Sequence, residues 1–171
     1  MLHLFEKACV APVKGRTLVV GSKLYPTKMV DRRKRYEDAV GVDMAEGDGV
    51  DLVLNLEEPL PDDVGKFSHI DCLSVLEHSR RPWLLAANLE RLLEDGGSIF
   101  VAVPFIWRVH GYPDDYWRFT ASGIRELFPN IKWKYGAYVH ANISREGEIL
   151  TTNIDGHQYY ARTEFCAFGY K

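Results

Sequence analysis

The chain has 171 residues, the length of one ordinary domain with a single core. Hydrophobic residues make up 46% of it and charged residues 26%, which excludes a disordered chain, and no apolar run is long enough to span a bilayer. The formal net charge of −3 provides no general attraction to nucleic acid or to an anionic membrane, so both are disfavoured as partners.

Cysteine usage and the N-terminal residues bear on the cellular compartment. Cys9, Cys72 and Cys166 are odd in number and far apart, so they fit neither a disulfide framework nor a zinc site. Residues 1–12 include Glu6 and Lys7 and hold no signal-peptide core. We therefore expect a reducing, cytoplasmic location. A homodimer is compatible with the sequence, which does not specify an oligomeric state.

Short β-branched runs alternate with longer helical or mixed stretches along the first two thirds of the chain. The predicted strands are residues 17–21, 39–43, 50–54, 69–75 and 98–103. Continuous apolar strands of this kind are typical of a parallel sheet covered on both faces. Strand–helix alternation with right-handed crossovers then predicts an α/β, doubly wound fold.

Three stretches have helical character. Residues 27–38 are helical by propensity, although their apolar stripe is poor, and the basic run at 32–35 is expected to be a solvated face. Pro82 begins the clearest helix, and Gly96-Gly97 is expected to end it with a left-handed cap. Its apolar stripe consists of Leu85, Leu89, Leu92 and Leu93. Residues 120–128 predict a further short helix that stops before Pro129.

The last third of the chain changes character. Residues 132–140 and 161–170 alternate between apolar and polar positions, and turn residues at Gly147 and Asp155-Gly156 lie between them. This pattern predicts an antiparallel hairpin that closes the sheet.

Two residues at predicted strand ends are candidates for ligand binding, because doubly wound sheets bind ligands at the carboxyl ends of their strands. Gly21, followed by Ser22, lets the backbone approach a ligand closely. Asp43 comes 22 residues later, near the ~20-residue spacing at which an acidic side chain accepts hydrogen bonds from adenosine ribose hydroxyls. Each residue alone also fits a plain turn or a solvated aspartate, so the pair is the better indication.

Two further segments follow the third and fourth predicted strands. Asn55 and Leu56 lie in a loop that would flank a nucleotide base, with Leu56 covering it and Asn55 at its polar edge, although a plain turn at Asn55 is equally compatible. Residues 75–78 (VLEH) lie beside the topological switch point, where His78 is either structural or catalytic.

The loop at residues 108–119 (RVHGYPDDYWRF) gathers aromatic, acidic and basic side chains. It suits a ligand-facing wall, with Tyr112, Tyr116 and Trp117 as apolar surfaces. The alternative is a loop that packs its aromatics on the core and pairs its two aspartates with arginines: Asp114, Asp115, Arg108 and Arg118. No metal is expected, because the remaining histidines show no ligand spacing: His3, His69, His140 and His157.

In this order, the residues resemble a known family. The chain is similar to class I S-adenosylmethionine-dependent methyltransferases in five features that follow one another in the same order. These are the strand ending at Gly21, the acidic strand end at Asp43, VLEHSRRPW at 75–83, the Leu-rich helix with Gly96-Gly97, and HGYPDDYWRFT at 110–120. The likeness is to the methyltransferase type 11 group, in particular a bacterial and phage subgroup with the tyrosine-tryptophan-arginine-phenylalanine loop. It covers about residues 17–128.

The resemblance implies a Rossmann-like, seven-stranded, mostly parallel sheet with an antiparallel last strand and helices on both faces. Residues 1–171 would then be one methyltransferase domain, with an N-terminal extension (1–16), a cofactor-binding core (17–128) and a C-terminal β-hairpin (129–171). The implied cofactor is S-adenosyl-L-methionine. Its contacts fall on Gly21, Ser22, Asp43, Met44, Asn55, Leu56, Ser74 and Val75.

Methyl transfer requires the acceptor to be positioned and, where needed, deprotonated. We expect the base to be His110, with Asp114, Tyr116 and His78 as the next candidates, and the acceptor to be a small molecule or a glycan. That family carries two or three glycines in its first motif, whereas here only Gly21 is present. A degenerate, cofactor-binding interaction module is therefore one alternative, and an NAD-dependent oxidoreductase is a second, less favoured one.

Overall fold

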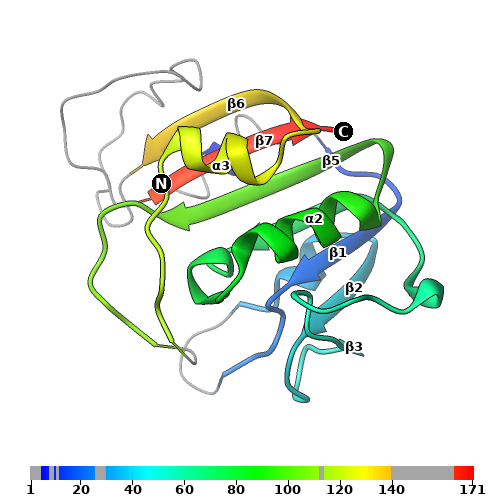
Figure 1. Cartoon of the computed structure of the whole chain (residues 1–171). Coiled ribbons are helices and arrows are strands. Elements are labelled where there is room, and N and C mark those ends of the chain that lie inside the picture. The colour runs from blue at the N-terminus through cyan, green and yellow to red at the C-terminus, as the bar shows by residue number, and fades with distance from the viewer. Residues whose placement is uncertain (1–4, 8–9, 11, 26–29, 112–113, 140–163) are drawn as a thin grey trace.

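Seven strands form one sheet in the order β3-β2-β1-β4-β5-β7-β6 in the computed structural model (Figure 1). The model describes residues 5–7, 10, 12–25, 30–111, 114–139 and 164–171. The strands are β1 (Arg16–Val20), β2 (Asp38–Asp43), β3 (Leu52–Val53), β4 (Phe67–Leu73), β5 (Leu93–Pro104), β6 (Lys132–Val139) and β7 (Glu164–Tyr170).

The register shows how the predicted strands assemble. β1 lies inside the sheet and pairs in parallel with β2 through Val20 and Val42, and with β4 through Val20 and Cys72. β3 and β5 extend the parallel sheet on either side, whereas β7 runs antiparallel to both β5 and β6. The doubly wound, seven-stranded sheet with an antiparallel last strand is therefore confirmed.

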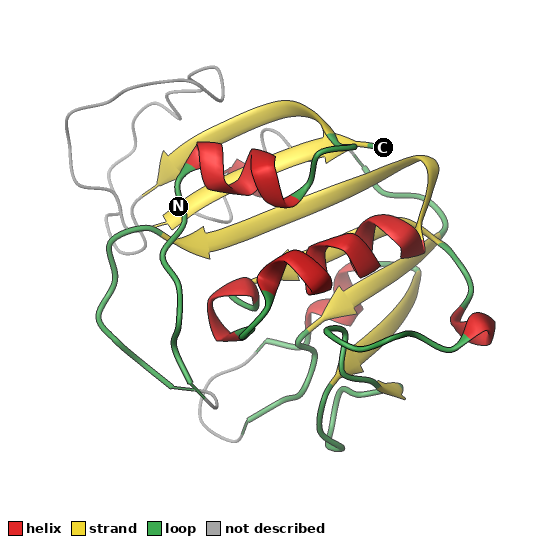
Figure 2. Ribbon diagram, viewed as in Figure 1, coloured by secondary structure: helices red, strands yellow, loops and turns green. Residues whose placement is uncertain are grey.

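Two helices cover one face of this sheet, α2 (Pro82–Leu92) and α3 (Ala121–Leu127) (Figure 2). Pro82 occupies the first turn of α2, as predicted, and the Thr120 side chain caps α3 by accepting a hydrogen bond from Gly123 N. Leu85 and Leu89 of α2 and Ile124 of α3 join the main core, which also contains inward-facing side chains of β1, β4 and β5. This face carries most of the buried apolar surface.

The other face is covered by shorter segments. Residues 5–7 are helical, and the Phe5 ring stacks on Phe100 of β5 with centroids 5.8 Å apart. A 3-10 helix, η1 (Arg32–Arg35), approaches the same face, where Arg32 Nε donates to Asp71 Oδ2 of β4 at 2.7 Å. Helical segments thus cover both faces, as predicted.

Several local predictions need correction. The described part of 27–38 holds only η1, because Tyr36 is extended and Asp38 already belongs to β2. Arg32, expected to be solvated, is partly buried and paired with Asp71 and Glu6. Such pairing across the fold has no signature in a local run of basic residues.

The ends of α2 and β4 also differ from the prediction. α2 ends at Leu92, and its C-cap residue Leu93 is extended and begins β5, so Gly96-Gly97 does not cap the helix. Gly96 does adopt the left-handed conformation (φ +78°), within the long strand β5. β4 ends at Leu73 rather than at residue 75. The predicted turns at Gly147 and Asp155-Gly156 lie outside the described residues. Within the described ranges, no helix is long and apolar enough to cross a membrane.

Candidate functional site

The order of the strands reverses between β1 and β4, and the backbone is unusual just beyond both of them. Gly21 follows β1 with φ +65°, and Ser74 follows β4 with φ +54°, the one non-glycine residue with positive φ in the described part of the chain. A Cβ built on Gly21 would lie 2.7 Å from Val75 Cγ2. The two turns are therefore packed against each other at the topological switch point, where doubly wound sheets bind ligands.

Asp43 joins this region from the end of β2. Its Oδ2 accepts a hydrogen bond from Lys23 N at 3.2 Å, and its Oδ1 accepts one from Ala45 N at 3.1 Å. The amides of Gly21 and Ser22 both donate to Val42 O, which holds the first-strand turn against the end of β2. An ionised carboxylate offers about four acceptor positions, so Asp43 can accept two further hydrogen bonds.

A small cavity lies beside the first-strand turn. Its lining includes Gly21 and Ser22 after β1, Arg32 of η1, and Asp71 of β4. Ser22 Oγ and Asp71 Oδ1 are buried, and neither has a hydrogen-bond partner among the described residues. The residues that line the cavity therefore include two whose polar side-chain atoms lack a hydrogen-bond partner among the described residues.

The loop after β3 is tied to the segment after β4. Glu57 Oε1 accepts hydrogen bonds from Ser79 Oγ at 2.8 Å and from Arg80 N at 2.9 Å. Asn55 Oδ1 accepts from Glu57 N, whereas the Leu56 side chain is buried in the core with 6% of its surface exposed. Asn55 is exposed, and so is Met44, which directly follows β2.

A 3-10 helix, η3 (Leu76–His78), follows β4 and anchors the long loop after β5. Tyr116 N donates to Glu77 O at 2.7 Å, and Trp117 Nε1 donates to Ser79 O at 2.8 Å. His78 Nδ1 lies 2.6 Å from the carbonyl oxygen of Asp114. These three contacts place the predicted acceptor loop directly over the end of β4.

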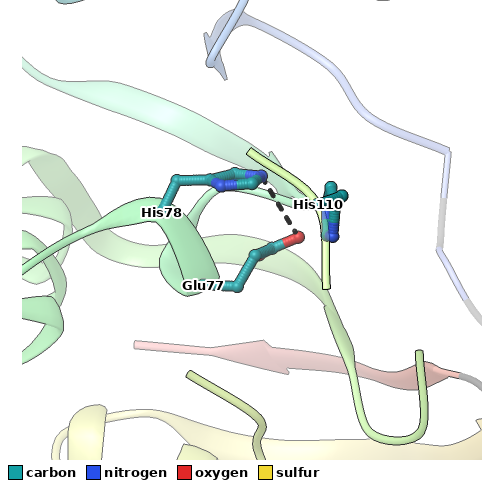
Figure 3. Close-up of side chains that lie close together, drawn as sticks. All are labelled: Glu77, His78 and His110. Carbon is teal, nitrogen blue, oxygen red and sulfur yellow. Dashed lines mark ion pairs between the residues drawn. The ribbon is translucent and has the colours of Figure 1, made fainter. Parts of the chain in front are cut away.

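Glu77 is a buried carboxyl group with little to stabilise its charge. Its exposed fraction is 1%, and its Oε2 has no hydrogen-bond partner among the described residues. Burial is the main reason why the pKa of Glu77 is raised to about 8; the nearby Asp115 carboxylate acts in the same direction, and Arg118 acts in the opposite one. Its Oε1 lies 3.8 Å from His78 Nε2 (Figure 3).

His110 is held by a buried carboxylate. Asp115 Oδ2 lies 3.0 Å from His110 Nδ1 and also accepts a hydrogen bond from His110 N at 2.8 Å. Arg118 donates to both oxygens of Asp115, and this pairing holds the pKa of Asp115 well below its usual range. The His110 ring meets the His78 ring edge to face, with centroids 4.9 Å apart.

The structure thus joins two of the four predicted catalytic residues. His78 and His110 lie together with Glu77 (Figure 3). Each of the three offers one atom that could bind a metal ion, and these three atoms lie within 4.8 Å of one another. Asp114 and Tyr116 instead contact each other, with Tyr116 OH donating to Asp114 Oδ2 at 2.7 Å, and both side chains are exposed.

Several roles were not apparent from the sequence. Glu77 could have been noted as a carboxylate inside an apolar run, but the burial of Asp115 had no such signal. Of the aspartate–arginine pairs predicted for this loop, the pair of Asp115 with Arg118 is present. Asp114 pairs instead with Arg80, which lies outside the loop, at 4.0 Å. Tyr112 lies outside the described residues.

No protein-family model and no curated protein matches the chain. Solved structures do. An S-adenosylmethionine-dependent methyltransferase from Thermotoga maritima is 16% identical, with a TM-score of 0.64, and the match covers 99% of this chain and 87% of that one. The 1,6-didemethyltoxoflavin N1-methyltransferase of Burkholderia thailandensis, solved with S-adenosylhomocysteine, is 13% identical, with a TM-score of 0.58 and coverage of 99% and 76%.

The N-methyltransferase NodS of Bradyrhizobium japonicum, also solved with S-adenosylhomocysteine, is 8% identical, with a TM-score of 0.53 and coverage of 91% and 76%. At identities this low, a shared fold is what the likeness establishes, and the site has to be judged on its own residues.

Proposed function

Because this chain has the fold of the class I S-adenosylmethionine-dependent methyltransferases, we propose that it binds S-adenosylmethionine and transfers its methyl group to an acceptor. The observation that carries this proposal is the meeting of two sets of residues at one edge of the sheet. The first-strand turn at Gly21 packs on Val75. The acid–histidine cluster, formed by Glu77, His78 and His110, begins two residues after Val75 in the chain.

The cofactor half of the site fits this ligand at three places. The cavity beside Gly21 and Ser22 can take the polar methionine end, since Ser22 Oγ lacks a partner among the described residues. Asp43 retains acceptor positions for the two ribose hydroxyls. We assign the remaining contacts to the adenine and to the centre of the cofactor, through Met44, Asn55, Leu56, Ser74 and Val75.

Leu56 takes part in that assignment in a restricted way. Its side chain is buried in the core, so the backbone at Leu56 and the exposed side chains of Asn55 and Met44 are the groups that an adenine would meet. An exposed Met and an exposed amide together suit a base, which needs both an apolar surface and a hydrogen-bonding edge.

When bound, S-adenosylmethionine supplies a methyl group activated by its sulfonium. The protein has to orient the acceptor and accept its proton. We assign this task to His110, because Asp115 holds its Nδ1 and leaves Nε2 able to accept a proton. His78 is the neighbouring alternative, and Asp114 and Tyr116 lie at the exposed rim.

The rim of the site supports a small-molecule or glycan acceptor. Trp83 and Trp117 pack edge to face with centroids 6.2 Å apart, and both remain partly exposed. Arg80 lies over the Tyr116 ring. Exposed aromatic faces of this kind provide apolar walls for a ring-shaped acceptor.

Calorimetric titration of the purified full-length chain with S-adenosylmethionine, S-adenosylhomocysteine and NAD tests the proposal. We expect saturable binding of the first two and none of NAD, since the first-strand turn lacks the dinucleotide glycine pattern. Binding of NAD alone would overturn the proposal in favour of an oxidoreductase.

A screen of small-molecule and glycan acceptors, followed by release of S-adenosylhomocysteine, separates an active enzyme from a degenerate interaction module. His110→Ala should lower turnover by ~10²-fold or more, while leaving the binding free energy of S-adenosylmethionine within about 0.5 kcal/mol. Glu94→Gln, an exposed substitution at the opposite end of β5, is the control. Full activity of His110→Ala would remove His110 from the reaction.

A further inference from the structure

We propose that Glu77, His78 and His110 bind one divalent transition-metal ion of the zinc type at the carboxyl end of β4. Methyl transfer as proposed above does not by itself require such an ion. No metal was expected from the sequence, in which His110 lies more than thirty positions after Glu77 and His78.

The three side chains form a set of donor atoms that suits a transition-metal ion. Each residue offers one ligand atom, and the three atoms lie within 4.8 Å of one another (Figure 3). Two imidazole nitrogens and one carboxylate oxygen suit Zn²⁺, Co²⁺, Fe²⁺ or Mn²⁺, whereas Mg²⁺ and Ca²⁺ prefer oxygen ligands. Bonds to such an ion are about 2.0–2.2 Å, so modest side-chain rotation would bring the three donors onto it.

The hydrogen bonds around the two histidines orient both rings for metal binding. His78 Nδ1 lies 2.6 Å from a carbonyl oxygen, that of Asp114, and His110 Nδ1 lies 3.0 Å from the Asp115 carboxylate. Both neighbours can only accept, so each Nδ1 carries the proton and each Nε2 is left with a free lone pair. Metal-binding histidines are held in this way, with the second ring nitrogen donating to a carboxylate or a carbonyl.

Glu77 is a buried carboxyl group that lacks a full set of hydrogen-bond partners. Its side chain is 1% exposed, and Oε2 has no partner within the described ranges, although buried carboxylates normally have one. Arg118 is committed to Asp115, through both oxygens of that carboxylate. A cation between Glu77 and the two imidazoles would satisfy this carboxylate, to which Arg118 makes no hydrogen bond among the described contacts.

The consequence for catalysis rests on the proposed function. Three protein ligands leave coordination positions open, as in catalytic rather than structural metal sites. A hydroxyl of the acceptor that coordinated there would lose its proton to water more readily, as metal-bound water does. Metal binding and base catalysis would use the same lone pair of His110, so in the metal-bound protein His110 positions the ion and does not act as the base.

The test is a titration of the chelator-treated, full-length chain with Co²⁺, followed by visible absorption, and with Zn²⁺, followed by calorimetry. We expect one ion per chain and new d–d absorption bands with Co²⁺. Glu77→Gln and His110→Ala should each weaken binding at least tenfold, whereas Glu94→Gln, the same carboxylate-to-amide change at an exposed position, should bind as the wild type does.

Two results would overturn the site: no saturable binding by the wild type, or binding that neither variant weakens. The second would place the ion elsewhere on the chain. If Glu77→Gln does not fold, His110→Ala decides alone, since His110 is less buried. The same samples are also titrated with S-adenosylmethionine, and this second titration tests the proposed function independently of the metal site. Its failure would remove the proposed function and leave the metal site standing, and the reverse also holds.

Discussion

The α-carbon of Gly21 faces Val75 so closely that a Cβ on Gly21 would lie 2.7 Å from Val75 Cγ2, and Gly21 also has φ +65°. Gly21→Ala should therefore destabilise the fold by about 2 kcal/mol or more, through left-handed strain and steric overlap. Adding Val75→Ala relieves the overlap alone. Urea denaturation of the two single variants and the double variant should show a favourable coupling of about 0.5–3 kcal/mol. Strict additivity would mean that the contact has no energetic weight.

Asp43→Ala should weaken S-adenosylmethionine binding at least tenfold. The expected cause is loss of charge-assisted hydrogen bonds to the ribose, each contributing about 1.5–3 kcal/mol. The matched control is Asp48→Ala. Asp48 is an exposed acid in the same loop region, and it accepts a hydrogen bond from Leu24 N through its backbone carbonyl, which the substitution retains. Calorimetry on folded protein is the measurement, and an unchanged dissociation constant for Asp43→Ala would remove Asp43 from the cofactor site.

Asp115→Asn should lower Co²⁺ and Zn²⁺ affinity by about 10–100-fold, the usual effect of removing the group that orients a metal-binding histidine. Asp114→Asn is the control, because Asp114 holds His78 through its backbone carbonyl, which the substitution retains. Circular dichroism should accompany the titration, since Arg118 loses its buried partner in Asp115→Asn. Equal affinities for the two variants would show that Asp115 does not position His110 for a metal.

His69 should make the fold sensitive to mild acid. Burial lowers the pKa of His69 to about 4, and its Nδ1 lies 2.8 Å from Ser98 Oγ. This pKa is below the unfolded value, so the unfolded chain takes up the proton first, and stability is lost as the pH falls from about 6.5 toward 4. Between pH 8 and pH 5, the free energy of unfolding of the wild type should drop by roughly 2 kcal/mol more than that of His69→Gln. Parallel pH profiles for the two proteins would contradict this.

The pairing of Arg32 with Asp71 predicts a strongly non-additive pair of substitutions. Asp71 has a fully buried side chain, its pKa is raised by burial, and Arg32 Nε donates to it at 2.7 Å. Arg32→Met should destabilise the protein by about 3–5 kcal/mol, because it leaves the buried Asp71 with the Tyr36 hydroxyl, a neutral donor, in place of its cationic partner. The double variant Arg32→Met/Asp71→Leu should recover at least half of that loss in thermal denaturation. A double variant no more stable than Arg32→Met would count against the pairing.

The sheet itself was predictable from the sequence. Runs such as residues 17–21 and 98–103 are apolar at successive positions, and burial on both faces of a parallel sheet requires that pattern wherever the strand lies. Pro82 and Thr120 marked helix starts for local reasons, since a first-turn proline and a capping hydroxyl act within a few residues. The boundary at Leu93 was missed because pairing with β4, and not the local apolar spacing, converts it from helix to strand.

The composition of the site could be predicted in part, and its geometry could not. Gly21, Asp43 and His78 could be predicted to lie at one edge of the sheet, because the strand ends in this fold converge there. The grouping of His110 with Glu77, and the burial of Asp115, depend on long-range hydrogen bonds such as Tyr116 N to Glu77 O. A loop without periodic structure does not encode which of its side chains turn inward. Only the tertiary contacts that hold it over the end of β4 decide that, so the acid–histidine cluster was visible only once the chain had folded.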